Sequence, residues 1–160
     1  MNKSIFLEIM RWVVVVAAVI FLITMFSQNR ISTAAPETVL EAVTSKLDMS
    51  EMQEANNRMI KRLYGLNPDD YESCVLYYPT TNMGAEELLI VKLSDMSQQE
   101  AVRTAVEKRL DTQKNSFDGY GVDQYDMLTK NCVIEVRGNY ILFVVHPASA
   151  AAAQAFLNAL

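Results

Sequence analysis

The chain begins with a long apolar run. Residues 12–26 are apolar apart from Thr24, and no charged residue lies between Arg11 and Arg30. A run of this length without a polar face is typical of a membrane-spanning helix, because a helix on a soluble domain turns polar residues toward water at regular intervals. We therefore predict a cytoplasmic N-terminus over residues 1–11, a transmembrane anchor over residues 12–29 and a short linker over residues 30–36.

Small residues that a signal peptidase accepts follow the run at positions 32–35. Pro36 comes directly after them and the run is long for a removable signal, which favours a retained anchor in the lipid bilayer. Lys3 and Arg11 lie before the run whereas only Arg30 follows it closely, so the positive-inside rule keeps the N-terminus in the cytoplasm. Residues 37–160 are then the extracytoplasmic domain of a single-pass membrane protein.

Helical spacing governs the first part of this domain. Apolar residues at positions 39, 40, 43 and 47 predict a helix over residues 37–47, directly behind Pro36. Ser50 with Gln53 resembles a capping box, and an apolar stripe then runs to Gly65. This second pattern predicts another helix.

A strand-strand-helix order occurs twice in the rest of the chain. Turn-forming residues separate the two strands of each unit, and Ser97 and Ser149 are candidate caps of the two helices. The predicted strands cover residues 74–78, 88–93, 132–136 and 140–145. Two such units fit the α+β class, with a mainly antiparallel four-stranded sheet. We expect helices to cover one apolar face of this sheet.

Cys74 and Cys132 lie at the starts of the opening strands of the two units. If these strands pair antiparallel at the centre of the sheet, the cysteines sit at opposite ends, too far apart for the ~4.4–6.8 Å between Cα atoms of a disulfide. Parallel neighbouring strands would bring them together instead. We predict no disulfide and two reduced thiols that pack as small hydrophobes.

The charge of the domain excludes two classes of partner. All but three of the 14 basic residues and all but one of the 19 acidic residues lie after Arg30, which leaves a formal charge of about −7. Nucleic acid and anionic lipid headgroups bind clustered lysines and arginines. We therefore expect no nucleic-acid partner and no docking of the domain on anionic lipid.

The sequence shows no recognisable catalytic or metal-binding set. His146 is the only histidine, and the acidic loop over residues 118–126 does not match an EF-hand, because no acidic residue falls at the first ligand position. A Gly-x-Ser-x-Gly turn is absent. Glu86 and Glu87 are adjacent on a strand and so point to opposite faces, and we interpret them as solvated edge charges. We predict no enzyme activity, no metal and no cofactor.

The candidate binding residues centre on the helix that follows the second strand. Arg109, Gln113 and Phe117 are spaced by four residues and so share one helix face, which should be buried. In a structural interpretation, the Arg109 guanidinium holds loop carbonyls or a carboxylate such as Asp126. In a functional interpretation, the group binds an anionic or peptide ligand. The candidate ligand-binding residues are then Arg109, Gln113, Tyr120 and Tyr140.

Five short motifs stand out: Tyr64-Gly65-Leu66, Gly84-Ala85-Glu86-Glu87, Arg109 with Gln113, Phe117 with Tyr120, and Gly138-Asn139-Tyr140. Together they resemble the pattern of a bacterial envelope family catalogued only as a domain of unknown function. Its members come largely from Clostridia-like Gram-positive bacteria and carry an N-terminal anchor, either a lipoprotein cysteine or a membrane helix. The resemblance implies an envelope location and no activity. This chain lacks the lipoprotein cysteine, and Val122 stands where the pattern has a proline before Gln124.

A membrane-anchored extracytoplasmic binding or accessory module of the bacterial cell envelope explains these features best. The predicted anchor, the acidic domain and the missing catalytic set favour it, and an envelope protein is the candidate partner. Two alternatives remain, namely an envelope enzyme with a dispersed active site and a secreted structural domain released by signal cleavage. Crosslinking and affinity capture would discriminate between a protein partner and a small-molecule product.

Overall fold

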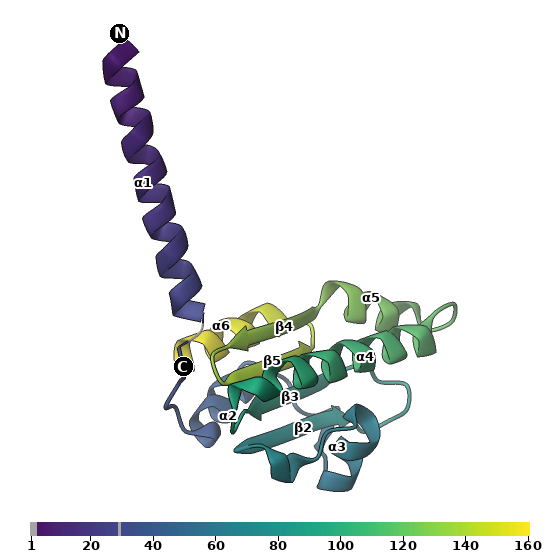
Figure 1. Cartoon of the computed structure of the whole chain (residues 1–160). Helices are drawn as coiled ribbons and strands as arrows, with labels where there is room; N and C mark the ends of the chain where they lie inside the picture. Colours follow the sequence, from purple (N-terminus) through teal and green to yellow (C-terminus); the bar gives the residue numbers. More distant parts are fainter. Residues whose placement is uncertain (1–2, 29) are drawn as a thin grey trace. The chain divides into compact units, whose positions relative to one another are not determined.

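The structure is a computed structural model that describes residues 3–28 and 30–160, and it describes the side chains of residues 8–20 and 30–160. The chain forms two compact units, Met1–Arg30 and Ile31–Leu160 (Figure 1). Each unit is described separately.

The first unit contains one helix, α1, which spans Lys3–Gln28. Within the described residues, no helix combines the length and the apolarity of a membrane span. This finding contradicts the predicted N-terminal transmembrane helix, and the predicted bounds of the anchor at residues 12–29 are not tested. Residues 1–2 and Asn29 of the predicted segments lie outside the described residues, and the location of the domain outside the cytoplasm stays a prediction.

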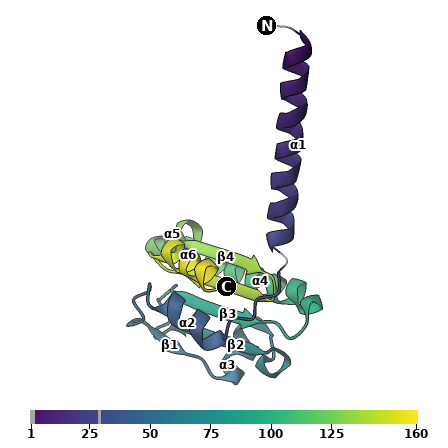
Figure 2. The same ribbon diagram turned by 90° about the vertical axis from the view of Figure 1, so that its left-hand side faces the viewer.

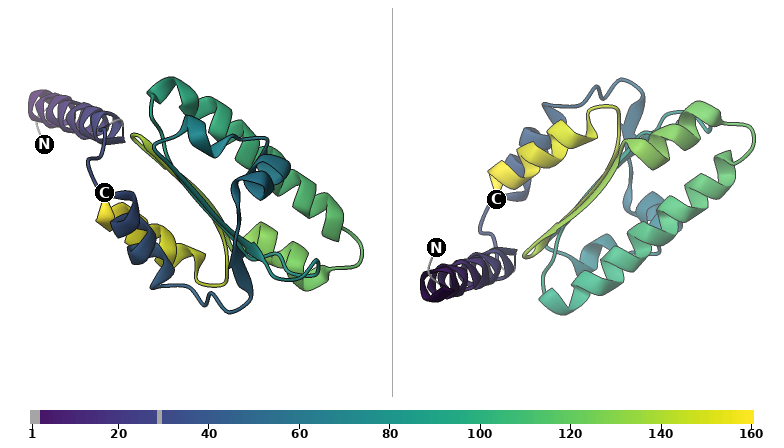
Figure 3. Two further views of the ribbon diagram at one scale, coloured as in Figure 1. Left: turned by 90° about the horizontal axis from the view of Figure 1, so that it is seen from below. Right: turned by 90° about the horizontal axis from the view of Figure 1, so that it is seen from above.

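The second unit has three layers, with one sheet between two layers of helices (Figure 3). α2 and α6 lie side by side on one face of the sheet (Figure 2). α3, α4 and α5 cover the other face. The helices are α2 (Pro36–Thr44), α3 (Asn57–Tyr64), α4 (Gln99–Phe117), α5 (Val122–Lys130) and α6 (Ser149–Ala159), with 3-10 turns at Pro68–Asp70 and Met96–Gln98.

The sheet has five strands in the order β1-β2-β3-β5-β4, and every neighbouring pair is antiparallel. The α+β class and the antiparallel pairing are as predicted. The predicted number of four strands is wrong, because a short strand precedes α3 and pairs with the edge of the first hairpin. The strands are β1 (Met52–Glu54), β2 (Ser73–Pro79), β3 (Glu87–Lys92), β4 (Cys132–Arg137) and β5 (Tyr140–Val145).

β1 and α3 share the stretch that the sequence predicts as one helix. Residues 52–54 pair with the end of β2, and α3 begins only at Asn57. The Asn56 side chain caps α3 by accepting the backbone N–H of Met59 at 3.0 Å, and Gly65 ends it in the left-handed conformation with φ of 72°. A strand of three residues depends on its partner strand, which is why its own spacing does not reveal it.

β3 and β5, the second strands of the two units, form the centre of the sheet and are buried along their whole length. Leu89 and Phe143 point to the layer of α3, α4 and α5, whereas Leu88 and Val144 point to α2 and α6. Consecutive apolar residues are typical of a strand that is covered on both sides. The prediction that helices cover a single face is therefore wrong.

Cys74 on β2 and Cys132 on β4 are free thiols that are half-buried under the layer of α4. β3 and β5 lie between these strands. At about 4.8 Å per strand spacing the two cysteines are separated by at least ~14 Å, which is beyond the reach of a disulfide. We expected the cysteines to be separated because β2 and β4 would pair antiparallel at the sheet centre. In the structure they are separated because β3 and β5 lie between these two strands.

Ser32 and Ala34 of the predicted linker form hydrogen bonds with the domain. The Ser32 N–H donates to Oδ1 of Asn139 at 2.8 Å, and the Tyr140 hydroxyl donates to the Ala34 carbonyl at 2.7 Å. The Ser32 hydroxyl donates to the carbonyl of Leu160 at 3.2 Å. The first and last residues of the second unit therefore meet.

Candidate functional site

Glu87 is a charged residue in the interior of the fold. It begins β3 and faces the same side as Leu89 and Val91, toward α4, because alternate residues of a strand share a face. Its side chain is 0% exposed. The interpretation of Glu87 as a solvated edge charge is therefore wrong, since β3 is an inner strand whose first residue lies under a helix.

Four donor groups converge on the Glu87 carboxylate. Arg109 donates from Nε to Oε1 (3.0 Å) and from Nη2 to Oε2 (2.7 Å), which is the bidentate geometry of a strong guanidinium–carboxylate pair. Nε2 of Gln113 donates to Oε2 at 2.8 Å, and the Tyr64 hydroxyl donates to Oε1. Arg109 thus holds a carboxylate, as the structural interpretation predicts, but that carboxylate is Glu87 and not Asp126.

The negative charge of Glu87 keeps the protons on its two titratable donors, Tyr64 and Arg109. Burial, followed by the negative charge of Glu87, raises the pKa of Tyr64 well above its ordinary value. Burial lowers the pKa of Arg109, but the hydrogen bond from Arg109 to Glu87 and the charge of Glu87 outweigh that effect and raise the pKa of the guanidinium. Tyr64 and Arg109 stay protonated at neutral pH, and Arg109 forms a buried ion pair with Glu87.

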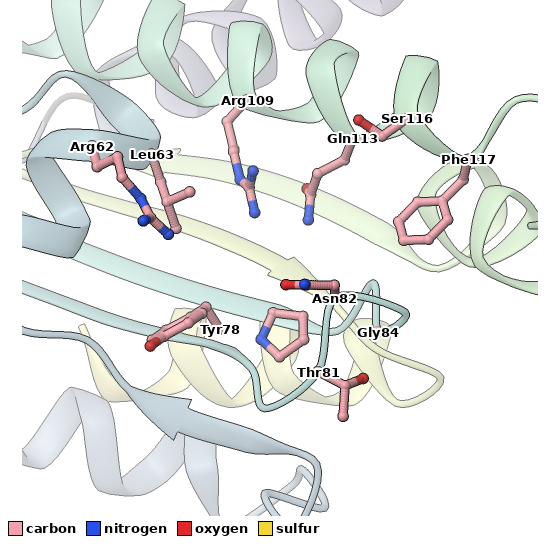
Figure 4. Close-up of a pocket in the computed structure, with 11 residues that line it drawn as sticks. Arg62, Leu63, Tyr78, Thr81, Asn82, Gly84, Arg109, Gln113, Ser116 and Phe117 are labelled. Atoms are coloured by element: carbon pink, nitrogen blue, oxygen red, sulfur yellow. The ribbon is translucent and has the colours of Figure 1, made fainter.

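A pocket of about 220 Å³ opens beside this network (Figure 4). Arg109 and Gln113 reach into it from α4, opposite Asn82 of the loop between β2 and β3. Arg62 of α3 and Phe117 of α4 also line it. The volume is below the ~300–1,000 Å³ of typical small-molecule sites.

One buried polar atom of Gln113 has no partner. Gln113 is 4% exposed, and its amide nitrogen is bonded to Glu87. Its Oε1 is the single buried side-chain nitrogen or oxygen in the described part of the chain that lacks a hydrogen bond. An unpaired buried acceptor costs about 1–3 kcal/mol. Because Gln113 is one of the residues that line the pocket, this oxygen is a candidate acceptor for a bound molecule.

The structure separates the four candidate ligand-binding residues. Arg109 and Gln113 meet at the pocket, in keeping with their spacing on α4. Tyr120 is 67% exposed, and its ring packs beside the ring of Phe117 with 6.3 Å between centroids. Tyr140 is buried on the opposite face of the sheet, among the residues that contact α2 and α6. Tyr140 therefore does not border the pocket.

The sequence does not assign Glu87, Tyr64 or Asn82 to the site, although the first two lie in motifs that resemble the family pattern. A signal for Glu87 exists, because the four residues after it are all apolar, as in a strand buried on both faces whose first residue is buried too. Tyr64 is the last residue of an apolar helical stripe before Gly65, which indicates that it faces the core. Asn82 has no distinguishing signal, since asparagine is an ordinary turn residue.

The arrangement offers a ligand hydrogen bonds and charge. Ser116 lines the pocket, but its hydroxyl already donates to the Thr112 carbonyl at 2.8 Å. His146 is buried, and its Nδ1 accepts the backbone N–H of Ala148 at 2.9 Å. The described residues contain no group of three or more His, Cys, Asp or Glu side chains that could hold a metal ion. The polar groups left for a ligand include the Gln113 oxygen, the Asn82 amide, the guanidinium groups and the hydroxyls of Tyr78 and Thr81.

These features define a three-layer α+β domain with a buried ion-pair network beside a surface pocket. The family described as Domain of unknown function (DUF4358) matches residues 45–146, and the chain belongs to this family. The matched segment contains Tyr64, Glu87, Arg109 and Gln113 but neither α2 nor α6. No curated protein and no solved structure matches the chain. Membership in a family of unknown function is confirmed, bacterial origin stays a prediction, and the predicted membrane anchor is not supported.

Proposed function

We propose that the protein is a non-catalytic binding module that recognises a peptide segment of a partner protein in the pocket beside Glu87. The observation that carries this proposal is the buried, unpaired Oε1 of Gln113 in the pocket wall. A backbone N–H or a polar side chain of a peptide satisfies that acceptor. The volume of about 220 Å³ accommodates one or two side chains and is small for a cofactor.

Exposed apolar side chains beside the pocket also support a protein partner. Five large hydrophobic side chains are exposed in Ile31–Leu160, and four of them lie on the β2–β3 loop, on the α4–α5 connection or on α5. Met83 lies between the pocket residues Asn82 and Gly84, and Tyr120 packs beside Phe117. Methionine and tyrosine are enriched at protein interfaces.

The test selects peptides from a random display library with the full chain and measures the Kd of an enriched peptide by calorimetry. Gln113→Met removes the pocket acceptor and one hydrogen bond to Glu87. Tyr64→Phe is the matched control, because it also removes one hydrogen bond to Glu87 but Tyr64 is not among the pocket-lining residues. We expect Gln113→Met to weaken binding at least about tenfold and Tyr64→Phe to change it less than about twofold.

Both variants disturb the same carboxylate, so their stabilities need a separate check. We expect each to lose about 1–3 kcal/mol of unfolding free energy. Asn82→Ala is a pocket variant at an exposed position and should weaken binding without changing stability. A library that yields no binder, or a Tyr64→Phe variant that binds as poorly as Gln113→Met, contradicts the proposal.

We also propose that the domain acts outside the cytoplasm of a bacterial cell. The resemblance of its motifs to those of envelope proteins supports this location. A C-terminal fusion to a reporter enzyme whose disulfides form only in an oxidising compartment tests it in a bacterial host. An inactive but intact fusion would argue for a cytoplasmic domain.

A further inference from the structure

α3 carries an exposed basic ridge that leads to the pocket. Arg58, Lys61 and Arg62 are all exposed, and the described residues contain no ion pair that involves any of them. Arg58 and Arg62 are four residues apart and so lie on one face of the helix. Arg62 itself lines the pocket. A row of cations without counter-charges thus extends the pocket along α3, in a domain whose formal charge is about −7.

Helix stability does not account for this ridge. Lys61 and Arg62 lie in the last turn of α3, where a positive charge interacts favourably with the helix dipole. Arg58 lies in the first turn, where a positive charge is unfavourable, and α3 has no acidic residue there. Neighbouring like charges also repel one another. The helix dipole therefore favours Lys61 and Arg62 but not Arg58, so it does not account for the ridge as a whole.

We propose that the partner segment is acidic. An extended peptide places carboxylates along Arg58, Lys61 and Arg62, and its adjacent residue donates a hydrogen bond to Oε1 of Gln113 inside the pocket. This inference rests on the proposed function, because it names the chemistry of the peptide that the pocket binds. A short acidic peptide suits the ridge better than nucleic acid does, since the net negative charge of the domain repels a long polyanion beyond the contact area.

The test uses the same display library and the full chain, and it compares an enriched peptide with a neutral analogue in which Asp and Glu become Asn and Gln. The double variant Arg58→Gln/Lys61→Gln removes two exposed charges that do not line the pocket. Lys46→Gln, which removes one exposed charge from the loop between α2 and β1, is the control for a charge change away from the ridge. We expect enriched peptides to be acidic and the double variant to weaken binding about tenfold in low salt and about threefold in 0.5 M salt, with no change for Lys46→Gln.

The outcomes separate this inference from the proposed function. Enriched peptides that are neutral, depend on Gln113 and ignore the Arg58→Gln/Lys61→Gln change overturn the acidic ligand and leave the binding module standing. A library without binders overturns both. Acidic peptides that bind the Gln113→Met variant as tightly as the unaltered chain would show that the ridge binds them without the pocket. That result overturns both the acidic ligand of the pocket and the proposed function. Single-stranded DNA is the probe for another class of ligand. If it binds the full chain more tightly than any acidic peptide, and this binding depends on Arg58 and Lys61, the acidic-peptide proposal is overturned.

Discussion

Arg109 and Glu87 depend on each other in the interior of the domain. The Arg109 side chain is 15% exposed and the Glu87 side chain is 0% exposed, so little water reaches either charge. Removing one partner of such a pair destabilises a protein strongly, because the other charge stays buried without compensation. Since Arg109 also lines the pocket, damage to this pair affects the fold and the candidate site together.

We expect Glu87→Gln to lower the unfolding free energy by about 3–5 kcal/mol, because it keeps the size of the side chain but leaves Arg109 without a counter-charge. Urea denaturation followed by circular dichroism measures the change. Glu86→Gln is the matched control on the neighbouring residue, which is partly exposed and should change stability by less than about 0.5 kcal/mol. Equal denaturation midpoints for the two variants would show that the buried pair does not stabilise the fold.

The half-buried thiols of Cys74 on β2 and Cys132 on β4 make the stability of the fold depend on pH. Burial raises the pKa of Cys74 to about 12 and, as the main cause, that of Cys132 to about 11, from an ordinary value of 9.0. The folded state therefore favours the neutral thiols. Their contribution to stability is complete below pH 9.0 and is lost as the pH rises through about 11 and 12.

We expect both native thiols to react slowly with a thiol-specific disulfide reagent at pH 8. Each unit of pKa lowers the thiolate fraction tenfold, so the fraction falls roughly 1,000-fold for Cys74 and roughly 100-fold for Cys132 relative to the unfolded chain. Stopped-flow absorbance with and without denaturant measures the two rates. Native rates that match those of the denatured chain at pH 8 would mean that the strands do not protect the thiols.

Elements with a strong repeat of apolar residues were predictable from the sequence. α2, α4 and α6 follow such repeats because each buries one regular face, and the four longer strands are runs rich in apolar residues between turn-forming residues. β1 has three residues and is a strand only because the end of β2 pairs with it. α5 lies in the acidic stretch that the sequence analysis treated as a loop, and Leu128 is its one fully covered side chain. Such elements depend on tertiary contacts that no local pattern records.

Only part of the candidate site was predictable from the sequence. Arg109 and Gln113 were found because four-residue spacing is a local property of one helix. Glu87 was missed because its burial depends on the strand order, which places β3 at the centre under α4. Tyr140 was misplaced because its face of the sheet depends on a second helical layer that was not anticipated.

At the scale of the whole molecule, the segment that matches the family is shorter than the compact unit that folds around the sheet. The match over residues 45–146 ends before α6 and begins after α2, whereas the compact unit is Ile31–Leu160. α2 and α6 cover Leu88, Ile90, Leu142 and Val144 on the central strands. Full burial of each such side chain stabilises a protein by about 1.5–3 kcal/mol, and the sum is comparable to the whole stability of a domain.

We therefore expect a fragment of residues 45–146 to lack a cooperative thermal transition and to bind a dye that reports exposed apolar surface. A fragment of residues 31–160 should melt cooperatively, because it retains both helical layers. Near-ultraviolet circular dichroism and dye fluorescence compare the two fragments. Cooperative melting of the shorter fragment would show that α2 and α6 are dispensable.

The helices that close this second face come from the two ends of the unit, with the Ser32 hydroxyl bonded to the last carbonyl of the chain. On the ribosome, α2 emerges well before α6, its partner on this face. The nascent chain therefore carries an uncovered apolar sheet face until α6 has left the exit tunnel. A molecular chaperone that shields β3 and β5 during synthesis would act at the step where the chain is most prone to aggregate.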